Sequence, residues 1–377
     1  MKEKHSDLQE SIRVFALNEL GLDLRERDQS EEFQKEDWQA CAKQGIFGLN
    51  TPKRLGGSEL GTLESVEALE SLGYGCPDNG LTLGINAQVW CVQAPILKFG
   101  NGFQHEKYLT GMVDGSQIGV HAMTEAEAGS DALNMKSIAK RVDNGYRLTG
   151  KKQFVGLAPV ADTILTFAVT NPARKKWGIT AMIVDAKSVG VTLHDSESKM
   201  GLRTIPTGAI GFEDVFVPDE NVLGKEGAGA SIFNASMDYE RSFIFCSHVG
   251  SMARQLDETV AFAKDRKLDG TPISKLQSVS NRIADMRLRL ETSRLLLHQA
   301  ARLVDAGKRI PLEASMAKLH ISEAFVENSL SAIRVCGGRG YMSEWGVERD
   351  LRDAVGGIIY SGTSDIQRNL IAAMLGL

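Results

Sequence analysis

The order in which two hydrophobic patterns follow one another constrains this chain more than any other feature. Up to about residue 118, apolar residues recur at three- and four-residue spacing, as in SEEFQKEDWQACAKQGIFGL, which predicts helices. From Ile118 to Gly224, short runs rich in Val, Ile, Thr and Phe alternate with turn residues and predict a small antiparallel sheet or barrel. From about Ala230 the helical period returns and holds to the end.

A sheet set between two helical regions predicts an α+β multidomain fold. A chain of 377 residues is long for one compact core. We therefore expect an N-terminal α-helical domain over residues 1–118, a middle β-domain over 119–226 and a C-terminal helical bundle over 227–377. No tandem repeat or low-complexity linker divides them.

Composition excludes several classes of protein. The net charge of −5 gives no reason to expect nucleic-acid binding, and no apolar run approaches the length that spans a bilayer. The first residues alternate charged and apolar side chains, unlike a signal peptide. The five cysteines are scattered without a CxxC pair, which argues against disulfides and against a zinc or other metal site. The simplest expectation is a protein of the reducing cytoplasm.

Five motifs carry the functional signal, and any one alone is typical of an ordinary polar loop. They are HAMTEAEAGSD (121–131), KMGLRTIPTGAIGFEDVFVPDENVLG (199–224), DRKLDGTPISKLQSVSNRIADM (265–286), VCGGRGYMSEWGVERDLRDA (335–354) and IYSGTSDIQRN (359–369). In this order and spacing the chain resembles the acyl-CoA dehydrogenase family over nearly its whole length. The resemblance implies a helical domain, a β-domain and a four-helix bundle. It also implies FAD bound between them and across a subunit interface, in a homo-oligomer that is usually a tetramer.

The resemblance implies which residues contact FAD. They are Met123, Thr124, Gly129, Ser130, Phe154, Gly156, Arg266, Gln277, Arg334, Gly337, Gly338, Thr363 and Asp365. The first four line the flavin and thioester site in this interpretation. Arg266, Gln277 and the Gly337–Gly338 pair hold the diphosphate and adenosine across subunits.

This sequence departs from the family at several of these positions. Phe154 stands where Trp is usual, and Gly156 stands where a hydroxyl usually bonds the flavin edge, so a backbone N–H would have to serve there. Asp269 replaces a Phe, and Arg334 replaces a Gln but can still pair with a diphosphate. The detailed flavin contacts are therefore expected to differ from those of the family.

The family removes an α-proton from an acyl thioester while a hydride passes to flavin N5. The glutamate that usually takes the proton is replaced by Ser361, whose backbone N–H can still polarise the thioester carbonyl. Glu240, directly before Arg241, matches the base of the isovaleryl- and long-chain-acyl branches, so we expect Glu240 to be the catalytic base. Asp238 and Arg241 can share a helix face, whereas Glu240 points elsewhere. The resemblance implies substrate contacts at Ser130, Asp238, Arg241, Tyr360, Ser361 and Gly362. The competing interpretation is that Glu240 is a solvated helix residue.

The relocated base and the altered FVGL segment resemble the carrier-protein-linked branch of the family. That branch oxidises aminoacyl groups, notably L-prolyl, held by phosphopantetheine on an acyl or peptidyl carrier protein in natural-product pathways. The alternative is a short- or branched-chain acyl-CoA thioester. A basic entrance would favour an acidic carrier, and ARKKWG (173–178) is one such cluster, although an exposed turn explains it equally well. A flavin oxidase or oxygenase, and a non-catalytic flavin-fold protein, are the alternatives of other classes.

Overall fold

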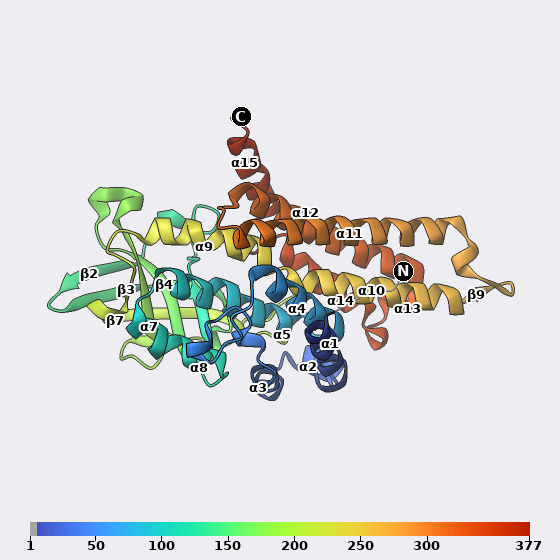
Figure 1. The fold of residues 1–377 in the computed structure, drawn as a ribbon, viewed down its shortest axis with the longest axis horizontal. Coiled ribbons are helices and arrows are strands. Elements are labelled where there is room, and N and C mark those ends of the chain that lie inside the picture. Colours follow the sequence, from blue (N-terminus) through green and yellow to red (C-terminus); the bar gives the residue numbers. More distant parts are fainter. Residues whose placement is uncertain (1–5) are drawn as a thin grey trace.

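The computed structural model describes residues 6–377 and has the predicted order of helices, sheet and helices (Figure 1). The helices before the sheet are α1 (Asp7–Glu19), α2 (Leu24–Ser30), α3 (Lys35–Lys43), α4 (Thr62–Gly75), α5 (Asn79–Asn86), α6 (Ala94–Phe99), α7 (Gly102–Gln104) and α8 (Thr110–Val113). A π-helical turn, η3 (Ala87–Gln93), joins α5 to α6. Ser6 and Gln9 cap α1 reciprocally, each side chain bonding the other residue's backbone N–H.

The middle of the chain forms one eight-stranded sheet in the order β6-β7-β3-β2-β4-β5-β8, with β1 paired to β4. The strands are β1 (Gly119–Ala122), β2 (Ile138–Val142), β3 (Gly145–Gly156), β4 (Thr163–Val169), β5 (Ile179–Asp185), β6 (Val191–Leu193), β7 (Thr207–Pro218) and β8 (Val222–Leu223). The prediction of an antiparallel sheet is wrong at β4, which pairs with both β1 and β2 in parallel. Parallel pairing arises from crossover connections, which alternation within a strand does not encode.

The C-terminal part packs long helices side by side, with the sheet at one end and a small hairpin at the other (Figure 1). Its helices are α9 (Gly229–Phe243), α10 (Cys246–Asp265), α11 (Gln277–Asp305), α12 (Pro311–Cys336), α13 (Gly338–Tyr341), α14 (Val347–Gly357) and α15 (Ser364–Met374). The sequence predicted only helices after about Ala230, but the chain also forms a hairpin there. Its strands are β9 (Lys267–Leu268) and β10 (Thr271–Pro272). Its two-residue turn, Asp269–Gly270, has both residues at positive φ, as such turns require.

Helices α4 and α10 join the N-terminal helices to the bundle at very short range. A Cβ added to Gly73 would lie 2.1 Å from the Ser247 carbonyl oxygen, and one added to Gly250 would lie 2.0 Å from that of Glu70. Only glycine allows the two backbones to approach this closely.

Among the described helices, none combines the length and apolar composition needed to cross a membrane.

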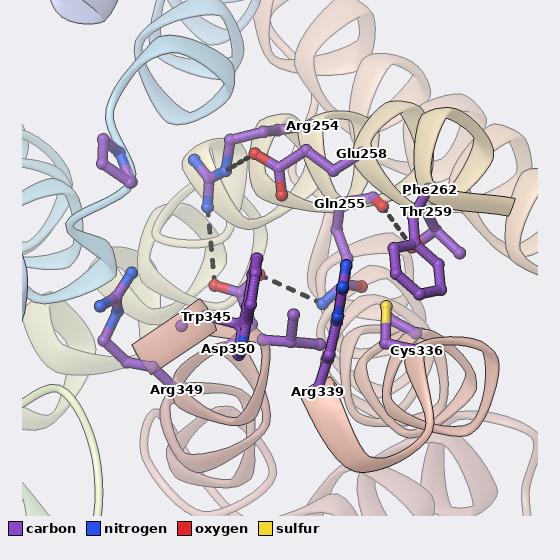
Figure 2. Close-up of a pocket in the computed structure, with 14 residues that line it drawn as sticks. Arg254, Gln255, Glu258, Thr259, Phe262, Cys336, Arg339, Trp345, Arg349 and Asp350 are labelled. Atoms are coloured by element: carbon purple, nitrogen blue, oxygen red, sulfur yellow. Dashed lines mark hydrogen bonds and ion pairs between the residues drawn. The ribbon is translucent and has the colours of Figure 1, made fainter. Parts of the chain in front are cut away.

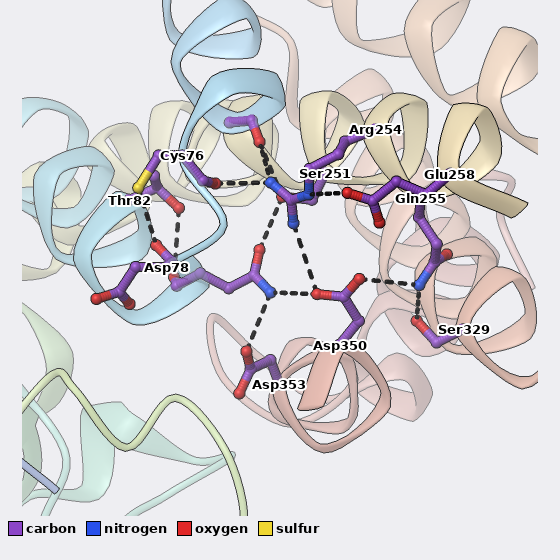
Figure 3. A network of polar contacts seen from close by, with 12 residues as sticks. Cys76, Asp78, Thr82, Ser251, Arg254, Gln255, Glu258, Ser329, Asp350 and Asp353 are labelled. Atoms are coloured by element: carbon purple, nitrogen blue, oxygen red, sulfur yellow. Dashed lines mark hydrogen bonds and ion pairs between the residues drawn. The ribbon is translucent and has the colours of Figure 1, made fainter. Parts of the chain in front are cut away.

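A buried polar network fixes α5, α10 and α14 relative to one another (Figure 3). The Asn79 amide donates to Asp350 and to Asp353, at 3.0 Å each, and accepts from Ser251 at 2.7 Å. Arg254 donates to the carbonyls of Gly73 and Cys76 at 2.8 and 2.7 Å. Burial raises the pKa of Asp353 to about 7. The network connects segments that are more than 250 positions apart in the sequence.

Replacing Asn79 with Leu should destabilise the fold strongly. The variant removes the donors to two buried carboxylates, which should lower the free energy of unfolding by roughly 3 kcal/mol in urea denaturation. Asn134→Leu, at an exposed asparagine whose amide bonds only Asp131, is the control and should stay within about 0.5 kcal/mol of wild type. Equal losses in both variants would contradict the structural role of Asn79.

Candidate active site

Glu240 and Ser361, 121 positions apart, meet in a hydrogen bond. Helix α9 carries Glu240, and the loop between α14 and α15 carries Ser361, whose Oγ donates to Glu240 Oε1 at 2.9 Å. Ser361 has a φ of 56° and Gly362 a φ of 84°, so the loop turns through left-handed backbone. That conformation is unfavourable for serine and persists only where neighbouring contacts impose it.

Tyr360 is one of the contacts that hold this loop. Its hydroxyl lies 2.7 Å from His248 Nε2 on α10, and its ring stacks on Phe245 with centroids 5.6 Å apart. Burial lowers the pKa of His248 to about 4, so the imidazole is neutral at neutral pH and shares a hydrogen bond with the tyrosine hydroxyl. Gln367 adds donors to the carbonyls of Ser361 and Gly362.

The Glu240 carboxylate retains one free oxygen in a shielded position. Its side chain is 12% exposed, and Oε2 has no hydrogen-bond partner within residues 6–377. His121 Nδ1 lies 3.8 Å from Oε2, too far for a hydrogen bond. The Cys91 thiol is close by, and its pKa is raised by burial and by the Glu240 charge. A carboxylate oxygen without a donor, in a shielded position, is suited to accept a proton from carbon.

Asp238 and Arg241 do not pair with each other. Asp238 is buried and accepts from Arg309 Nε at 2.6 Å, and Arg309 lies in the connection between α11 and α12. The Nε of Arg241 is buried without a partner in the described chain, and burial lowers the pKa of Arg241. Arg241 also forms no ion pair with Glu240 within residues 6–377, in agreement with the expectation that these neighbours point in different directions.

The positions expected at the flavin edge lie next to one another. Phe154 is 64% exposed and has a φ of 56°, at a register shift between β3 and β7. The carbonyl of Thr124 accepts from the backbone N–H of Gln153, which brings the loop after β1 to Phe154. Lys152 is buried, pairs with Glu125 at 2.9 Å and donates to the Met123 carbonyl. An exposed aromatic ring on strained backbone fits a planar ligand such as a flavin.

The other positions of this loop and of the last helix are accessible or serve the backbone. Gly129 and Ser130 are exposed after β1, and a Cβ on Gly129 would meet nothing within 4 Å. Gly156 ends β3. Thr363 caps α15 by accepting from the N–H of Ile366, whereas Asp365 is exposed and pairs with Arg368.

The remaining predicted FAD contacts lie at the far end of the bundle from the sheet (Figure 1). They are all exposed: Arg266, Gln277, Arg334, Gly337 and Gly338. A single chain therefore does not bring them together with Phe154. This separation is what a cofactor site completed by two subunits requires.

A separate pocket of about 230 Å³ lies between α10, α12, α13 and α14 (Figure 2). Arg339 stacks on Trp345 in this pocket, at 4.6 Å from the ring centroid, and Arg254 and Asp350 belong to the buried network. Its lining does not include Glu240 or Ser361. The polar groups of this pocket hold helices together and do not form part of the Glu240 site.

Sequence reasoning missed several residues that shape the Glu240 site. His121 opens the first motif but was not identified as a neighbour of Glu240, and Cys91 and His248 carry no local signal. Arg309 is 71 positions from Asp238, so only the fold reveals their pairing.

Comparisons with known proteins establish the family. The models of the acyl-CoA dehydrogenase N-terminal, middle and C-terminal domains match residues 2–116, 121–215 and 227–376. The chain belongs to the acyl-CoA dehydrogenase family, which confirms the resemblance, the three-part fold and the FAD-dependent oxidoreductase class.

Individual members of the family are similar to this chain over nearly its whole length. An L-prolyl-[peptidyl-carrier protein] dehydrogenase from Pseudomonas fluorescens is 40% identical over 93% of this chain and 92% of the relative. The crystal structure of the prolyl acyl carrier protein oxidase AnaB is 40% identical, with a TM-score of 0.98 and full coverage of both chains. The structure of PigA with FAD and proline is 37% identical, with a TM-score of 0.96 and full coverage of both chains.

Acid should destabilise the fold through His248. The unfolded chain takes up a proton on this residue below pH 6.5, whereas the folded chain does so only near pH 4, so stability is lost as the pH falls through this window. The loss should approach roughly 3 kcal/mol. His248→Gln keeps a hydrogen-bond acceptor but does not titrate. Urea denaturation from pH 7 to pH 4 should show the stability difference between wild type and variant shifting in favour of the variant. A difference independent of pH would argue against a buried neutral His248.

Proposed function

We propose that this protein is an FAD-dependent dehydrogenase of thioester-bound acyl groups, with Glu240 as the base that removes the α-proton. The observation that carries the proposal is the Glu240 carboxylate, held at Oε1 by Ser361 and free at Oε2 in a shielded site. The serine that replaces the family's usual base thus contacts the residue expected to take over its role.

The residues at the flavin edge fit FAD. The isoalloxazine ring would be held by Met123, Thr124, Phe154 and Gly156. The residues at the far end of the bundle would hold the adenosine diphosphate part of the FAD whose flavin ring lies in a neighbouring subunit. When bound, FAD supplies the acceptor for the hydride that leaves the β-carbon. Arg334 adds a guanidinium that can pair with phosphate.

Three features of the chain would serve the proton transfer. Glu240 takes the proton at Oε2, and the Ser361 hydroxyl fixes the orientation of the carboxylate. The Ser361 backbone N–H polarises the thioester carbonyl and so acidifies the adjacent C–H bond. The aromatic rings of Phe233 and Phe167 exclude water from the far side of His121.

We propose an L-prolyl group on a phosphopantetheine carrier protein as the substrate, in a natural-product pathway. The names of the relatives support this choice, and so do two neighbouring cations on the surface beside helix α9. Arg309 is 59% exposed beside Asp238, and the exposed Lys98 lies 5.1 Å from the Tyr239 ring centroid. The pKa of Lys98 is lowered by burial and by the charge of Arg309, which indicates that the two cations are close. Two such cations near Glu240's helix would attract an acidic carrier protein.

A homo-oligomer, most simply a tetramer, would complete the cofactor site. Large apolar side chains are exposed beside the glycines at the bundle's far end: Leu276, Tyr341, Met342 and Trp345. An exposed apolar cluster of this kind is typical of a subunit interface. The reducing cytoplasm is the proposed location, since the five cysteines are free thiols.

Glu240→Gln should lower the rate at which substrate reduces the bound flavin by at least about 10³-fold, because an amide cannot take the α-proton. FAD should stay bound at the wild-type stoichiometry. Stopped-flow bleaching of the flavin absorption under anaerobic conditions measures the rate. Glu213→Gln, at an exposed glutamate on β7, is the control and should react at the wild-type rate. Normal flavin reduction in Glu240→Gln would exclude Glu240 as the base.

The substrate is tested by offering prolyl-loaded carrier protein and a panel of short- and branched-chain acyl-CoAs to the anaerobic enzyme. Bleaching by the carrier alone is the expected result. Bleaching by an acyl-CoA alone would replace the carrier assignment with that of an acyl-CoA dehydrogenase. Rapid peroxide formation in air without an added acceptor would identify an oxidase, and protein purified without FAD would favour a non-catalytic role.

A further inference from the structure

His121 has a buried ring nitrogen that nothing in the described chain binds. Strand β1 places its ring parallel to Phe233, with the planes 2° apart and centroids at 6.4 Å, and edge-on to Phe167 at 5.5 Å. Nε2 has no hydrogen-bond partner among residues 6–377. Nδ1 lies 3.8 Å from Glu240 Oε2, which is beyond hydrogen-bond distance. Burying a polar group without a partner costs about 1–3 kcal/mol. An unpaired imidazole beside the proposed base therefore indicates a place for a ligand group.

The His121–Glu240 pair has more acceptors than donors. Burial lowers the pKa of His121, the Lys152 charge lowers it further, and the Glu240 charge opposes both. At neutral pH the imidazole is thus uncharged, with one N–H and one nitrogen that can accept. Glu240 Oε2 is a second unpaired acceptor. The cation whose charge acts on His121, Lys152, already donates to Glu125 and to the Met123 carbonyl, and neither Arg241 nor Cys91 forms a hydrogen bond to His121 within residues 6–377, which leaves the imidazole open to a donor from a ligand.

An α-amino group would supply that donor. The nitrogen of an aminoacyl thioester is bonded to the carbon that loses the α-proton, about 1.5 Å away. Its acceptor must therefore lie within a few ångströms of the oxygen that takes the proton. His121 Nδ1 and Glu240 Oε2, which lie 3.8 Å apart, can each lie about 2.9 Å from one such C–N unit when Nδ1 is the ring nitrogen that accepts. A plain acyl group offers only C–H bonds here and would leave Nδ1 unpaired.

This inference rests on the proposed function and deepens it. We propose that His121 accepts a hydrogen bond from the amine of the substrate and thereby selects α-aminoacyl thioesters over acyl thioesters that lack nitrogen. The contact makes and breaks no covalent bond, and the α-proton still goes to Glu240. His121 is in this sense a specificity residue, and the aromatic rings around it fix its orientation.

A matched pair of substrates tests the selection. Prolyl and cyclopentanecarbonyl groups differ by one ring nitrogen, and both can be loaded on the same carrier protein. Wild type should reduce its flavin at least about 100-fold faster with the prolyl group, because a site that bonds an N–H rejects the analogue without it. His121→Phe, which keeps the aromatic packing, should lower this ratio at least tenfold by slowing the prolyl reaction. His121→Gln, which retains an acceptor, should restore part of it. An unchanged ratio in His121→Phe would overturn the inference, and His194→Phe, at an exposed histidine, is the control that should keep the wild-type ratio.

A second measurement does not depend on turnover. The chain has seven histidines, so ¹⁵N-histidine labelling gives a simple spectrum in which the His121 signals are those missing from His121→Phe. The probe is a prolyl amide of aminopantetheine, in which an amide replaces the thioester of the substrate. At saturation it should shift these signals, whereas the matching cyclopentanecarbonyl amide should not. Unmoved His121 signals with the prolyl amide would refute the proposed contact. Failure of both thioesters to reduce the wild-type flavin would instead refute the proposed function, and the labelling result would stand separately.

Discussion

The hydrogen bond between Ser361 and Glu240 is the contact on which the proposed chemistry of this fold depends. It joins a helix next to the sheet to a loop near the end of the chain, and the packing of the helices around them sets where the two segments lie. Helices α4 and α10 approach each other through glycines, and Asn79 ties α5 to α14. The strained backbone at Ser361 is sustained by contacts of its neighbours, the Tyr360–His248 bond above all. Packing far from the site therefore contributes to the position of the proposed base.

The sequence predicted the order of the elements and the helices and strands with the longest patterns. It also singled out Glu240 as the candidate base, because the loss of a carboxylate at position 361 coincided with a glutamate before Arg241, and that role stays a prediction. The sequence did not predict the parallel strand pairing or the small hairpin, and the reasons differ. The parallel pairing of β1 and β2 with β4 depends on chain crossovers that no strand's own pattern records. The β9–β10 hairpin did have a local signal, the Asp269–Gly270 pair, which the surrounding helical pattern obscured.

The partners of the site residues were beyond sequence reasoning for a physical reason. Spacing within one helix suggested that Asp238 and Arg241 share a face, but a buried carboxylate pairs with whichever cation the tertiary fold brings to it, and that is Arg309. His121 illustrates the same limit, since a histidine in a strand is more often a packed core residue than a neighbour of a base. Only its distance from Glu240 and its unpaired nitrogen distinguish the two cases.

The geometry also explains how a base can move within a fold without loss of the reaction. The proposed carbonyl-polarising donor at position 361 is a backbone N–H, and every residue except proline supplies one. The side chain at that position is therefore free to change, provided that another carboxylate can approach the same carbon. Helix α9 meets this condition, because Glu240 already lies within hydrogen-bonding distance of Ser361 Oγ. A serine is a better occupant of position 361 than an apolar residue, since its hydroxyl satisfies one carboxylate oxygen and leaves the other oxygen for the proton.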